Sequence, residues 1–565
     1  MTEPTSADSH SAVVPQAAES STPLDGLRGA VLTAAQELGS PVSQADAITL
    51  ERPRRAQFGD YSTNAALLLA PILGGTPREI AERLGGALQL SLGASLERFE
   101  VAGPGFVNLF MADSWLRGAL VEVLAAGSDF GGGKAAKPER VLVEFVSANP
   151  TGPMHVGHAR NAAYGDALAR MLALQGHRVE REFYVNDAGS QVRKFGESIQ
   201  ALARGQELPE DGYKGDYVVD LASSIPNAGE MDAGELGRAG VELMVEGVKR
   251  SLADFRVEGF DRWFFESALH AGDPSPVDHT LGILAEQGST YEQEGALWLR
   301  TSQFGDDKDR VLVRSDGEHT YFASDIAYHQ DKRERGFERQ IDIWGADHHG
   351  YVLRMKAAYE ALGGDPEELE LLIMQLVHLL RSGEREQMSK RSGQFVSLED
   401  LVGEIGVDAA RWYLLARSHD TTVDLDLDLA REQSNENPVY YVQYAHARIA
   451  SMLARAGAER VGEAMAAVSG AGQHESLLPA ERSLIEQLLA FPGELEEAVE
   501  RRAPHRVAAY ALELAQGFTA FYRDCRVIGA EPASVESTRI ALCVASREVI
   551  GRCLALLGVS APEHM

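Results

Sequence analysis

The sequence lacks features that define several classes of protein. Its 565 residues contain no apolar run of about 18 residues, the length that a helix needs to cross a membrane. There are only three cysteines, Cys525, Cys543 and Cys553, and no C-x-x-C pair, which argues against a disulfide framework and a thiolate zinc site. Residues 1–22 are rich in Ser, Thr, Pro and Ala, without the basic start or apolar core of a signal peptide. We therefore expect a cytoplasmic protein with a disordered tail over residues 1–22, no membrane partner and no protein-bound zinc.

Positive charge is also scarce. The chain has 53 Lys and Arg residues against 84 Asp and Glu, a formal net charge of −31 at pH 7. Phosphate contacts need local positive potential, so nucleic acid could bind only where basic residues gather. Nine of the basic residues are lysines and the last is Lys390, so a basic surface on the C-terminal 175 residues must be built from arginine. The charge leaves a nucleic-acid partner open.

Residues 141–185 predict a βαβ unit. VLVEFV is a short apolar strand, which the cluster NPTGP ends. Small and apolar residues then recur at helical spacing as far as Gly176, and residues 179–185 predict a second strand. Strand, loop, helix and strand within about 45 residues indicate a parallel sheet. The segment 340–349 fits the second half of that sheet, with a largely helical insertion between the halves.

The segments that flank this sheet predict two further domains. Before it lie an amphipathic helix that ends at Gly39 and a strand in AGPGFVNLFM. After it, residues 437–565 show only the i, i+3, i+4 apolar recurrence of helices. We therefore expect an α+β module over residues 23–115, an α/β domain over 116–433 and an all-α bundle over 434–565.

The motif His155-Val156-Gly157-His158 lies where the first strand is followed by the helix. Backbone N–H groups and the helix dipole favour anionic ligands at such a position. The two histidines lie on one face of the first helical turn and could donate together to phosphate oxygens, and Gly157 leaves room for a flat ring such as adenine. Alone, the motif could be a chance occurrence or part of a metal site. Its strand–loop–helix setting favours nucleotide binding.

A second motif, Met388-Ser389-Lys390-Arg391-Ser392-Gly393, lies in a polar stretch that predicts a mobile loop. Lys390 could neutralise the charge that develops on a leaving pyrophosphate. By itself, the segment is better explained as a solvated Lys-Arg pair on a surface loop. Its occurrence together with the histidine motif favours the functional interpretation.

Together the two motifs resemble the paired signature of class I aminoacyl-tRNA synthetases, and the chain resembles the bacterial arginyl members. The similar blocks follow that family's order: SANPTGPMHVGHARN, YVNDAGSQ, TYFASDIAYH, IWGADHHGY, QMSKRSG, NPVYYVQYAHARI and LGVSAPEHM. The blocks GDYSTNAAL and AGPGFVNLF resemble its N-terminal module, which contacts the tRNA elbow. One position departs from the pattern: Gln387 replaces the lysine that usually opens the second signature, so Lys390 is the only lysine in that loop.

The resemblance implies a ligase that activates L-arginine with ATP and Mg²⁺ and then esterifies it to the 3′-terminal adenosine of tRNA(Arg). It implies a Rossmann-like catalytic domain with a helical insertion over 116–433, a tRNA-contacting module over 23–115 and an anticodon-binding bundle over 434–565. Magnesium would be held mainly by the phosphates of ATP. We expect the enzyme to be a monomer.

The resemblance also assigns site residues. The ATP-binding residues would be His155, Gly157, His158, Met388, Ser389 and Lys390, and the catalytic ones His155, His158 and Lys390. The arginine pocket would contain Glu144, Asn149, Tyr321 and Asp325, with Asp187 and His349 as further pocket or ribose candidates. Carboxylates suit a guanidinium because they can accept two hydrogen bonds in one plane. Without the resemblance, Glu144 could simply cap a strand, Asp325 could begin a helix, and Asp187 and His349 could be structural hydrogen-bonding groups.

In the C-terminal segment, Tyr440, Tyr444 and Arg448 would contact tRNA, because aromatic and arginine faces suit unstacked bases. At helical spacing, at least half of the tyrosines there could instead be core residues.

Three alternatives remain. Another nucleotidyl-transferring α/β enzyme would lack the long helical C-terminal segment. A class I lysyl enzyme would also need acidic pocket groups, but the SANPTG and NPVYYVQYAHARI blocks favour arginine. A non-catalytic RNA-binding paralogue is expected to have lost His155, His158 or Lys390, and all three are present.

Overall fold

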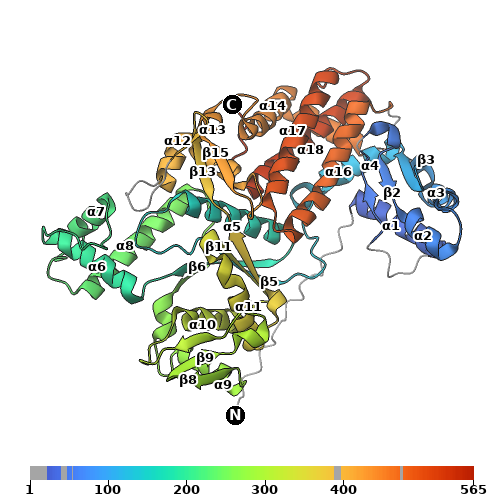
Figure 1. Ribbon diagram of the computed structural model, residues 1–565. Coiled ribbons are helices and arrows are strands. Elements are labelled where there is room, and N and C mark those ends of the chain that lie inside the picture. Colours follow the sequence, from blue (N-terminus) through green and yellow to red (C-terminus); the bar gives the residue numbers. More distant parts are fainter. Residues whose placement is uncertain (1–21, 40–46, 54, 387–395, 471–474) are drawn as a thin grey trace, which may run out of the picture. The chain divides into compact units, whose positions relative to one another are not determined.

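The computed structural model describes residues 22–39, 47–53, 55–386, 396–470 and 475–565, and it divides into two compact units (Figure 1). The first unit extends to Ala126, and the second runs from Gly127 to Met565. Apart from residue 22, the tail predicted for residues 1–22 lies outside the described residues.

The first unit combines an antiparallel sheet with helices. The sheet has the order β1-β2-β4-β3, formed by β1 (Leu50–Glu51), β2 (Tyr61–Thr63), β3 (Leu96–Ala102) and β4 (Phe106–Met111). The helices are α1 (Pro23–Glu37), α2 (Ala65–Leu73), α3 (Pro77–Leu92) and α4 (Asp113–Ala126), with the 3₁₀ helices η2 (Ala56–Phe58) and η3 (Gly93–Ser95). Both α1 and α3 begin with a proline behind a threonine capping box, which fixes their starts. The predicted α+β module is confirmed.

A five-stranded parallel sheet lies at the centre of the second unit. Its order is β12-β11-β5-β6-β7, formed by β5 (Arg140–Glu144), β6 (Arg178–Val185), β7 (Arg262–Phe265), β11 (Arg339–Gly345) and β12 (Leu369–Met374). Helix α5 (Val156–Leu174) connects β5 to β6, so the predicted βαβ unit is confirmed. Val141, Leu142 and Val143 are fully buried, as expected of a parallel strand covered on both faces. Strand β11 ends at Gly345, earlier than predicted, and the 3₁₀ helix η7 (Ala346–Tyr351) follows.

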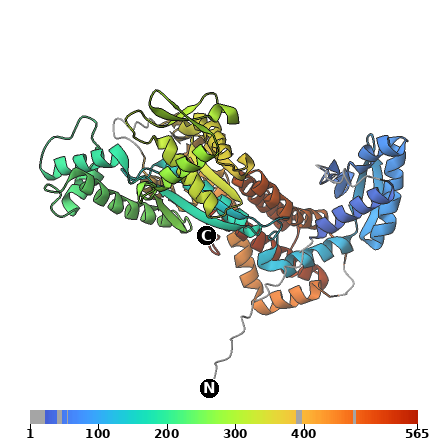
Figure 2. The same ribbon diagram turned by 90° about the horizontal axis from the view of Figure 1, so that it is seen from below.

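Between β6 and the helix that begins at Tyr321 the chain leaves the sheet twice. The helices α6 (Gly189–Ala203), α7 (Asp216–Ser224) and α8 (Ala233–Asp254) form a helical insertion that projects from the parallel sheet in both views (Figures 1 and 2). After β7 come η5 (Glu266–His270), α9 (Pro276–Glu286), η6 (Thr301–Phe304) and a small antiparallel sheet of β8 (Thr290–Gln293), β9 (Ala296–Leu299) and β10 (Arg310–Val313). This sheet was not expected, because each strand has only four residues, too few for a clear alternation.

The C-terminal half of this unit adds a second small sheet and the predicted bundle. Strands β13 (Val377–Arg381), β14 (Glu384–Arg385) and β15 (Val423–Asp426) pair in the order β14-β13-β15. The helices that accompany the two sheets are α10 (Tyr321–Glu334), α11 (Val352–Ala361), η8 (Pro366–Glu368), α12 (Leu398–Leu415) and α13 (Leu427–Arg431). The bundle contains α14 (Pro438–Ala456), α15 (Ala458–Val468), α16 (Pro479–Glu500), α17 (Pro504–Asp524) and α18 (Ala533–Leu556). In the described part of 438–565 every regular element is a helix, which confirms the all-α prediction.

A chain of ion pairs joins the amino ends of three parallel strands to the bundle. Arg339, at the start of β11, lies 2.9 Å from Glu139 and 2.8 Å from Glu370 of β12. Glu370 also pairs with Arg502, which lies between α16 and α17, at 2.7 Å. These four side chains, which we call the amino-end network, lie at the ends of the strands opposite to the carboxyl ends, where parallel sheets bind ligands.

Candidate functional site

The histidine motif caps α5 with its own side chains. His155 Nδ1 accepts the N–H of Gly157 at 3.1 Å, and His158 Nδ1 accepts the N–H of His155 at 3.3 Å. The two rings stack with centroids 3.7 Å apart. Because both Nδ1 atoms act as acceptors, a neutral ring carries its proton on Nε2, which is therefore a donor. A side chain at Gly157 would begin 2.9 Å from Cε1 of His155, so glycine is needed for this stack.

The residues predicted for the second signature, Met388, Ser389 and Lys390, lie outside the described residues, as does Gln387. The segments that flank them are described. On one side Glu386 pairs with Arg381, at 2.5 Å, and Arg381 also pairs with Glu404 of α12, at 2.6 Å.

On the other side the chain is joined to the histidine motif. Val396 accepts the N–H of Val156 at 3.3 Å, Leu398 donates to Met154 at 2.9 Å, and Ser397 forms a β-bridge with His155. The second flank is thus bonded directly to the backbone of the first motif.

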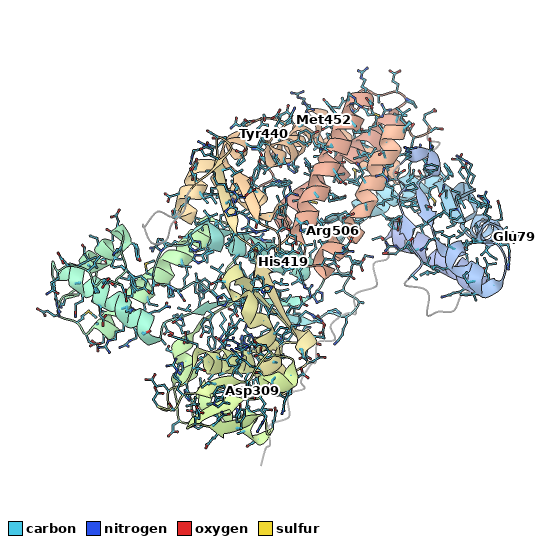
Figure 3. The ribbon with its side chains drawn as sticks, viewed as in Figure 1. Glu79, Asp309, His419, Tyr440, Met452 and Arg506 are labelled. Carbon is cyan, nitrogen blue, oxygen red and sulfur yellow. The ribbon has the colours of Figure 1, made fainter. Side chains whose placement is uncertain are left out.

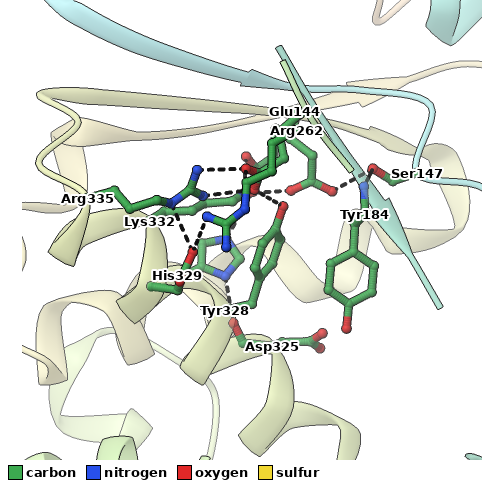
Figure 4. Close-up of polar contacts among 12 residues, drawn as sticks. Glu144, Ser147, Tyr184, Arg262, Asp325, Tyr328, His329, Lys332 and Arg335 are labelled. Carbon is green, nitrogen blue, oxygen red and sulfur yellow. Dashed lines mark hydrogen bonds and ion pairs between the residues drawn. The ribbon is translucent and has the colours of Figure 1, made fainter. Parts of the chain in front are cut away.

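Glu144, at the carboxyl end of β5, is buried and already paired with a cation. Its Oε2 accepts from Lys332 Nζ at 2.6 Å, and its Oε1 accepts from Ser147 at 2.8 Å (Figure 4). The fully buried Lys332 also donates to Asp342 at 2.7 Å, and Asp342 lies 2.9 Å from Nε2 of His329. Burial raises the pKa of Glu144, while Lys332 opposes that shift. Burial likewise acts to raise the pKa of Asp342, but Lys332 and His329 hold it below its ordinary value.

Asp325 and Glu266 form a second group of carboxylates, and the charge of Asp325 acts on Glu266. Asp325, on α10, accepts a 2.6 Å hydrogen bond from the hydroxyl of Tyr351, and burial raises its pKa. Glu266, the first residue of η5, is buried, and its interaction with the side chain of Tyr184 opposes the rise of its pKa. Burial and the nearby charge of Asp325 raise the pKa of Glu266 to about 7. Within the described residues neither carboxylate forms an ion pair with a basic side chain, so this group could hold a cationic ligand.

The remaining predicted pocket residues differ in their surroundings. Tyr321, at the start of α10, is 59% exposed, and Asn149 is exposed and donates to Gln191 at 3.3 Å. Asp187 accepts from both the backbone N–H and the hydroxyl of Ser267, at 2.8 and 2.6 Å, which fits the structural alternative. His349 is exposed and lies in η7, not in the strand predicted over 340–349.

Sequence reasoning missed four residues of this site: Glu266, Tyr184, Tyr351 and Lys332. A signal existed for Lys332, which follows Asp325 by seven residues and Tyr328 by four, so it lies on the same face of α10. A lysine in a helix is usually exposed, which hid its role.

The predicted tRNA contacts line two neighbouring pockets on the bundle. The rings of Tyr440 and Tyr444 stack at 6.1 Å, and the guanidinium of Arg448 lies 4.9 Å from the centre of the Tyr444 ring. One pocket, of about 530 Å³, is lined by residues that include Tyr444, Arg448, Met452, Arg455, Tyr522 and Arg526. The other, of about 500 Å³, is lined by Tyr440, Tyr444 and Arg448 among others. Figure 3 shows Tyr440 and Met452 on the bundle. The basic lining is built from arginine, as the distribution of lysine requires.

The parts of the chain that the structure describes contain no group of three or more His, Cys, Asp or Glu side chains arranged to hold a metal ion. None of the helices in these parts is long and apolar enough to cross a membrane.

Comparison with known proteins covers almost the whole chain. Residues 25–111 match the arginyl tRNA synthetase N-terminal domain, residues 119–214 and 273–450 the catalytic domain of class I (R) tRNA synthetases, and residues 442–565 the DALR anticodon binding domain. The arginine–tRNA ligase of Geobacillus kaustophilus is 46% identical over 534 residues, which are 92% of this chain and 94% of that protein. The one of Oceanobacillus iheyensis is 42% identical over 92% of this chain and 95% of its own length. The arginyl-tRNA synthetase structure of Thermus thermophilus is 25% identical, with a TM-score of 0.74 over 96% of this chain and 99% of that one.

Proposed function

Because the chain belongs to the arginyl-tRNA synthetase family, we propose that the carboxyl edge of its parallel sheet is where arginine and ATP react. The enzyme ligates L-arginine to tRNA(Arg) and uses ATP to form the arginyl adenylate first. Ligands of open α/β sheets bind outside the carboxyl ends of the strands, and the histidine motif, Glu144 and Glu266 all lie there.

In this proposal the histidine motif binds the phosphates of ATP. The backbone hydrogen bonds fix both Nδ1 atoms as acceptors, so the neutral rings of His155 and His158 carry their protons on Nε2, the atoms that would donate to phosphate oxygens. Lys390 would add positive charge near the leaving pyrophosphate. This role is supported by the backbone pairing of Val396 and Ser397 with the histidine motif, because these two residues follow Lys390 closely in the sequence.

The observation that carries the arginine pocket is the unequal charge balance of its carboxylates. Glu144 and Asp342 share the buried ammonium of Lys332 in direct ion pairs, whereas Asp325 and Glu266 repel each other and, within the described residues, neither is in an ion pair with a basic side chain. A guanidinium would relieve that repulsion, because it is positively charged and its planar set of N–H groups can donate hydrogen bonds to both carboxylates. We therefore assign the guanidinium of arginine to Asp325 and Glu266. Glu144, whose charge is balanced by Lys332, would line the pocket. Asn149 and Tyr321 would lie at its exposed side.

No nucleophile from the protein is needed. An oxygen of the arginine carboxylate attacks the α-phosphorus of ATP, the bond to the β-phosphate oxygen breaks, and pyrophosphate leaves with the electron pair. The adenylate carbonyl is then attacked by a hydroxyl of the terminal ribose of tRNA, which releases AMP. Mg²⁺ would enter with ATP, held by phosphate oxygens, because it binds through few protein ligands and retains water.

The bundle would bind the anticodon loop of tRNA(Arg) in the pockets around Tyr444 and Arg448. Tyrosine and arginine planes can stack on unpaired bases, and Arg455 and Arg526 add charge for phosphates. We assign residues 23–115 to tRNA contact, 116–433 to catalysis and 434–565 to anticodon binding, in an enzyme that acts in the cytoplasm as a monomer.

Pyrophosphate exchange into ATP tests this proposal. We expect exchange with arginine in the presence of tRNA(Arg), and none with lysine. Asp325→Asn keeps the shape but removes one charged partner, worth about 1.5–3 kcal/mol, so the KM for arginine should rise at least ~10-fold with little change in the KM for ATP.

Asp331→Asn is the matched control, because Asp331 lies on the same helix but pairs with Arg262 and Arg335 outside the pocket. An unchanged arginine KM in Asp325→Asn would remove Asp325 from the pocket. An equal rise in both KM values would place it in the shared scaffold.

A further inference from the structure

The loop between β5 and α5 contains two non-glycine residues in a left-handed conformation. Val146 has φ 70° and Ser147 has φ 38°. For a β-branched residue such as valine, this region of φ is sterically unfavourable, because its branched Cβ crowds the backbone. Residues held in this way persist only where surrounding contacts determine their conformation, and they concentrate at functional sites.

The side chain of Asn161 holds this turn. Asn161 is buried on α5, and its Oδ1 accepts the N–H of Val146 at 2.7 Å. Its Nδ2 donates to the carbonyl oxygen of Ile343 in β11 at 2.8 Å. One amide therefore joins α5, the strained turn and the neighbouring strand, and it needs both an acceptor and a donor to do so.

The turn in its strained form directs Ser147 back toward the arginine pocket. The hydroxyl of Ser147 donates to Glu144 at 2.8 Å and accepts the N–H of Tyr184 at 3.2 Å. The side chain of Tyr184 in turn interacts with Glu266. In Figure 4 the Tyr184 ring extends from the Ser147 side toward Asp325. The conformation of the turn therefore helps to position Glu144 and, through Tyr184, the carboxylate group of Asp325 and Glu266.

We infer that Asn161 is a positioning residue that sets the arginine pocket relative to the histidine motif. It lies six residues after His155 on the same helix, so the element that would bind ATP phosphates also fixes the turn that shapes the arginine pocket. The inference rests on the proposed assignment of that pocket. A displacement of about 1 Å between reacting groups can cost ~10²-fold in rate, which is the scale of effect that such a link controls.

Asn161→Ala removes both bonds and lets the turn relax. We expect kcat/KM for arginine to fall by at least ~10-fold, with the KM for ATP within about twofold of wild type, because the His155 and His158 cap bonds do not involve Asn161. Asn161→Asp retains the volume and the acceptor for Val146, but its second oxygen faces the Ile343 carbonyl. Asn161→Asp should show the same kinetic pattern. If the alanine variant does not fold, the kinetics of Asn161→Asp test the inference in its place.

The double variant Asn161→Ala/Val146→Gly separates positioning from stability. Glycine adopts positive φ without strain, so the second change should recover part of the melting temperature that Asn161→Ala loses. It should not restore kcat/KM, because a glycine without its partner is not held in the left-handed form. Recovery of activity together with stability, or an equal loss in the arginine and ATP parameters, would overturn the inference.

Ser198→Ala is a matched control in the helical insertion. The buried hydroxyl of Ser198 also makes two hydrogen bonds: it donates to the carbonyl oxygen of Lys194 within α6, at 2.8 Å, and accepts the N–H of Tyr213 from the following segment, at 3.0 Å. Its loss should lower stability and leave the kinetics unchanged. Arginine-dependent exchange by the wild-type enzyme tests the proposed function separately, whatever the outcome for Asn161.

Discussion

Replacing Lys332 with methionine would remove the cation that Glu144 and Asp342 share. The ammonium lies 2.6 Å from Glu144 and 2.7 Å from Asp342, and all three side chains are buried. Methionine has a similar volume, so little packing is lost. Removing one partner of a buried ion pair destabilises a protein by about 3–5 kcal/mol, because the remaining charge is left uncompensated. Asp342 retains His329, so we expect most of this loss to arise at Glu144.

The same variant should acquire a pH dependence of stability. Burial already raises the pKa of Glu144 and Lys332 opposes that shift, so the pKa should rise further once the lysine is gone. A carboxyl group with a raised folded-state pKa costs no stability at a pH where it is protonated in both states. It costs progressively more as pH rises from its unfolded pKa to its folded pKa. The deficit of the variant should therefore be smaller at about pH 5 than at about pH 8.

Urea unfolding followed by intrinsic fluorescence measures both effects. The companion variant Lys332→Met/Glu144→Gln removes the buried charge as well, and it should regain roughly half or more of the lost free energy of unfolding. A loss below about 1 kcal/mol in Lys332→Met would refute the reasoning, as would a double variant no more stable than the single one.

Three further expectations concern the chemistry. His158→Ala removes an Nε2–H donor, which should raise the activation barrier for exchange by about 2–4 kcal/mol and lower kcat accordingly, with the arginine KM unchanged. A kcat near that of wild type would contradict the phosphate role. A guanidinium favours the ionised form of Glu266, whose pKa is about 7, so the arginine KM should fall as pH rises from about 6 to about 8, and Glu266→Gln should flatten that profile. Arg448→Ala should raise the KM for tRNA(Arg) by ~10-fold or more in aminoacylation assays and leave the arginine and ATP KM values near wild type.

The parts of the site that could be predicted are those whose contacts are local. His155 and His158 interact within four residues, so a motif placed between a strand and a helix was enough to locate them. Asp325 was assigned to the pocket by resemblance alone. The α/β part and the all-α part followed from the change between continuous apolar runs and helical recurrence.

The parts that could not be predicted depend on distant residues or on disfavoured conformations. Lys332 and Glu144 are 188 residues apart in sequence, and a lysine offers no sign that it will be buried. Glu266 follows a strand of four residues after a long insertion, so no pattern relates it to Asp325. The left-handed turn falls on Val146, and nothing in the sequence would place a valine there, because valine is among the residues least suited to it.

The amino-end network of Glu139, Arg339, Glu370 and Arg502 has a consequence for the response to heat. The free-energy cost of removing charges from water falls as temperature rises, whereas apolar burial gains little more per unit area. Nearby arginines hold the pKa values of Glu139 and Glu370 below their ordinary range, so the network stays charged through neutral and mildly acidic conditions. Since Arg502 belongs to the bundle and Arg339 to the sheet, the connection between these parts should be retained up to the melting temperature. The catalytic sheet and the helical bundle are therefore expected to unfold together in a thermal scan, as one cooperative transition rather than two.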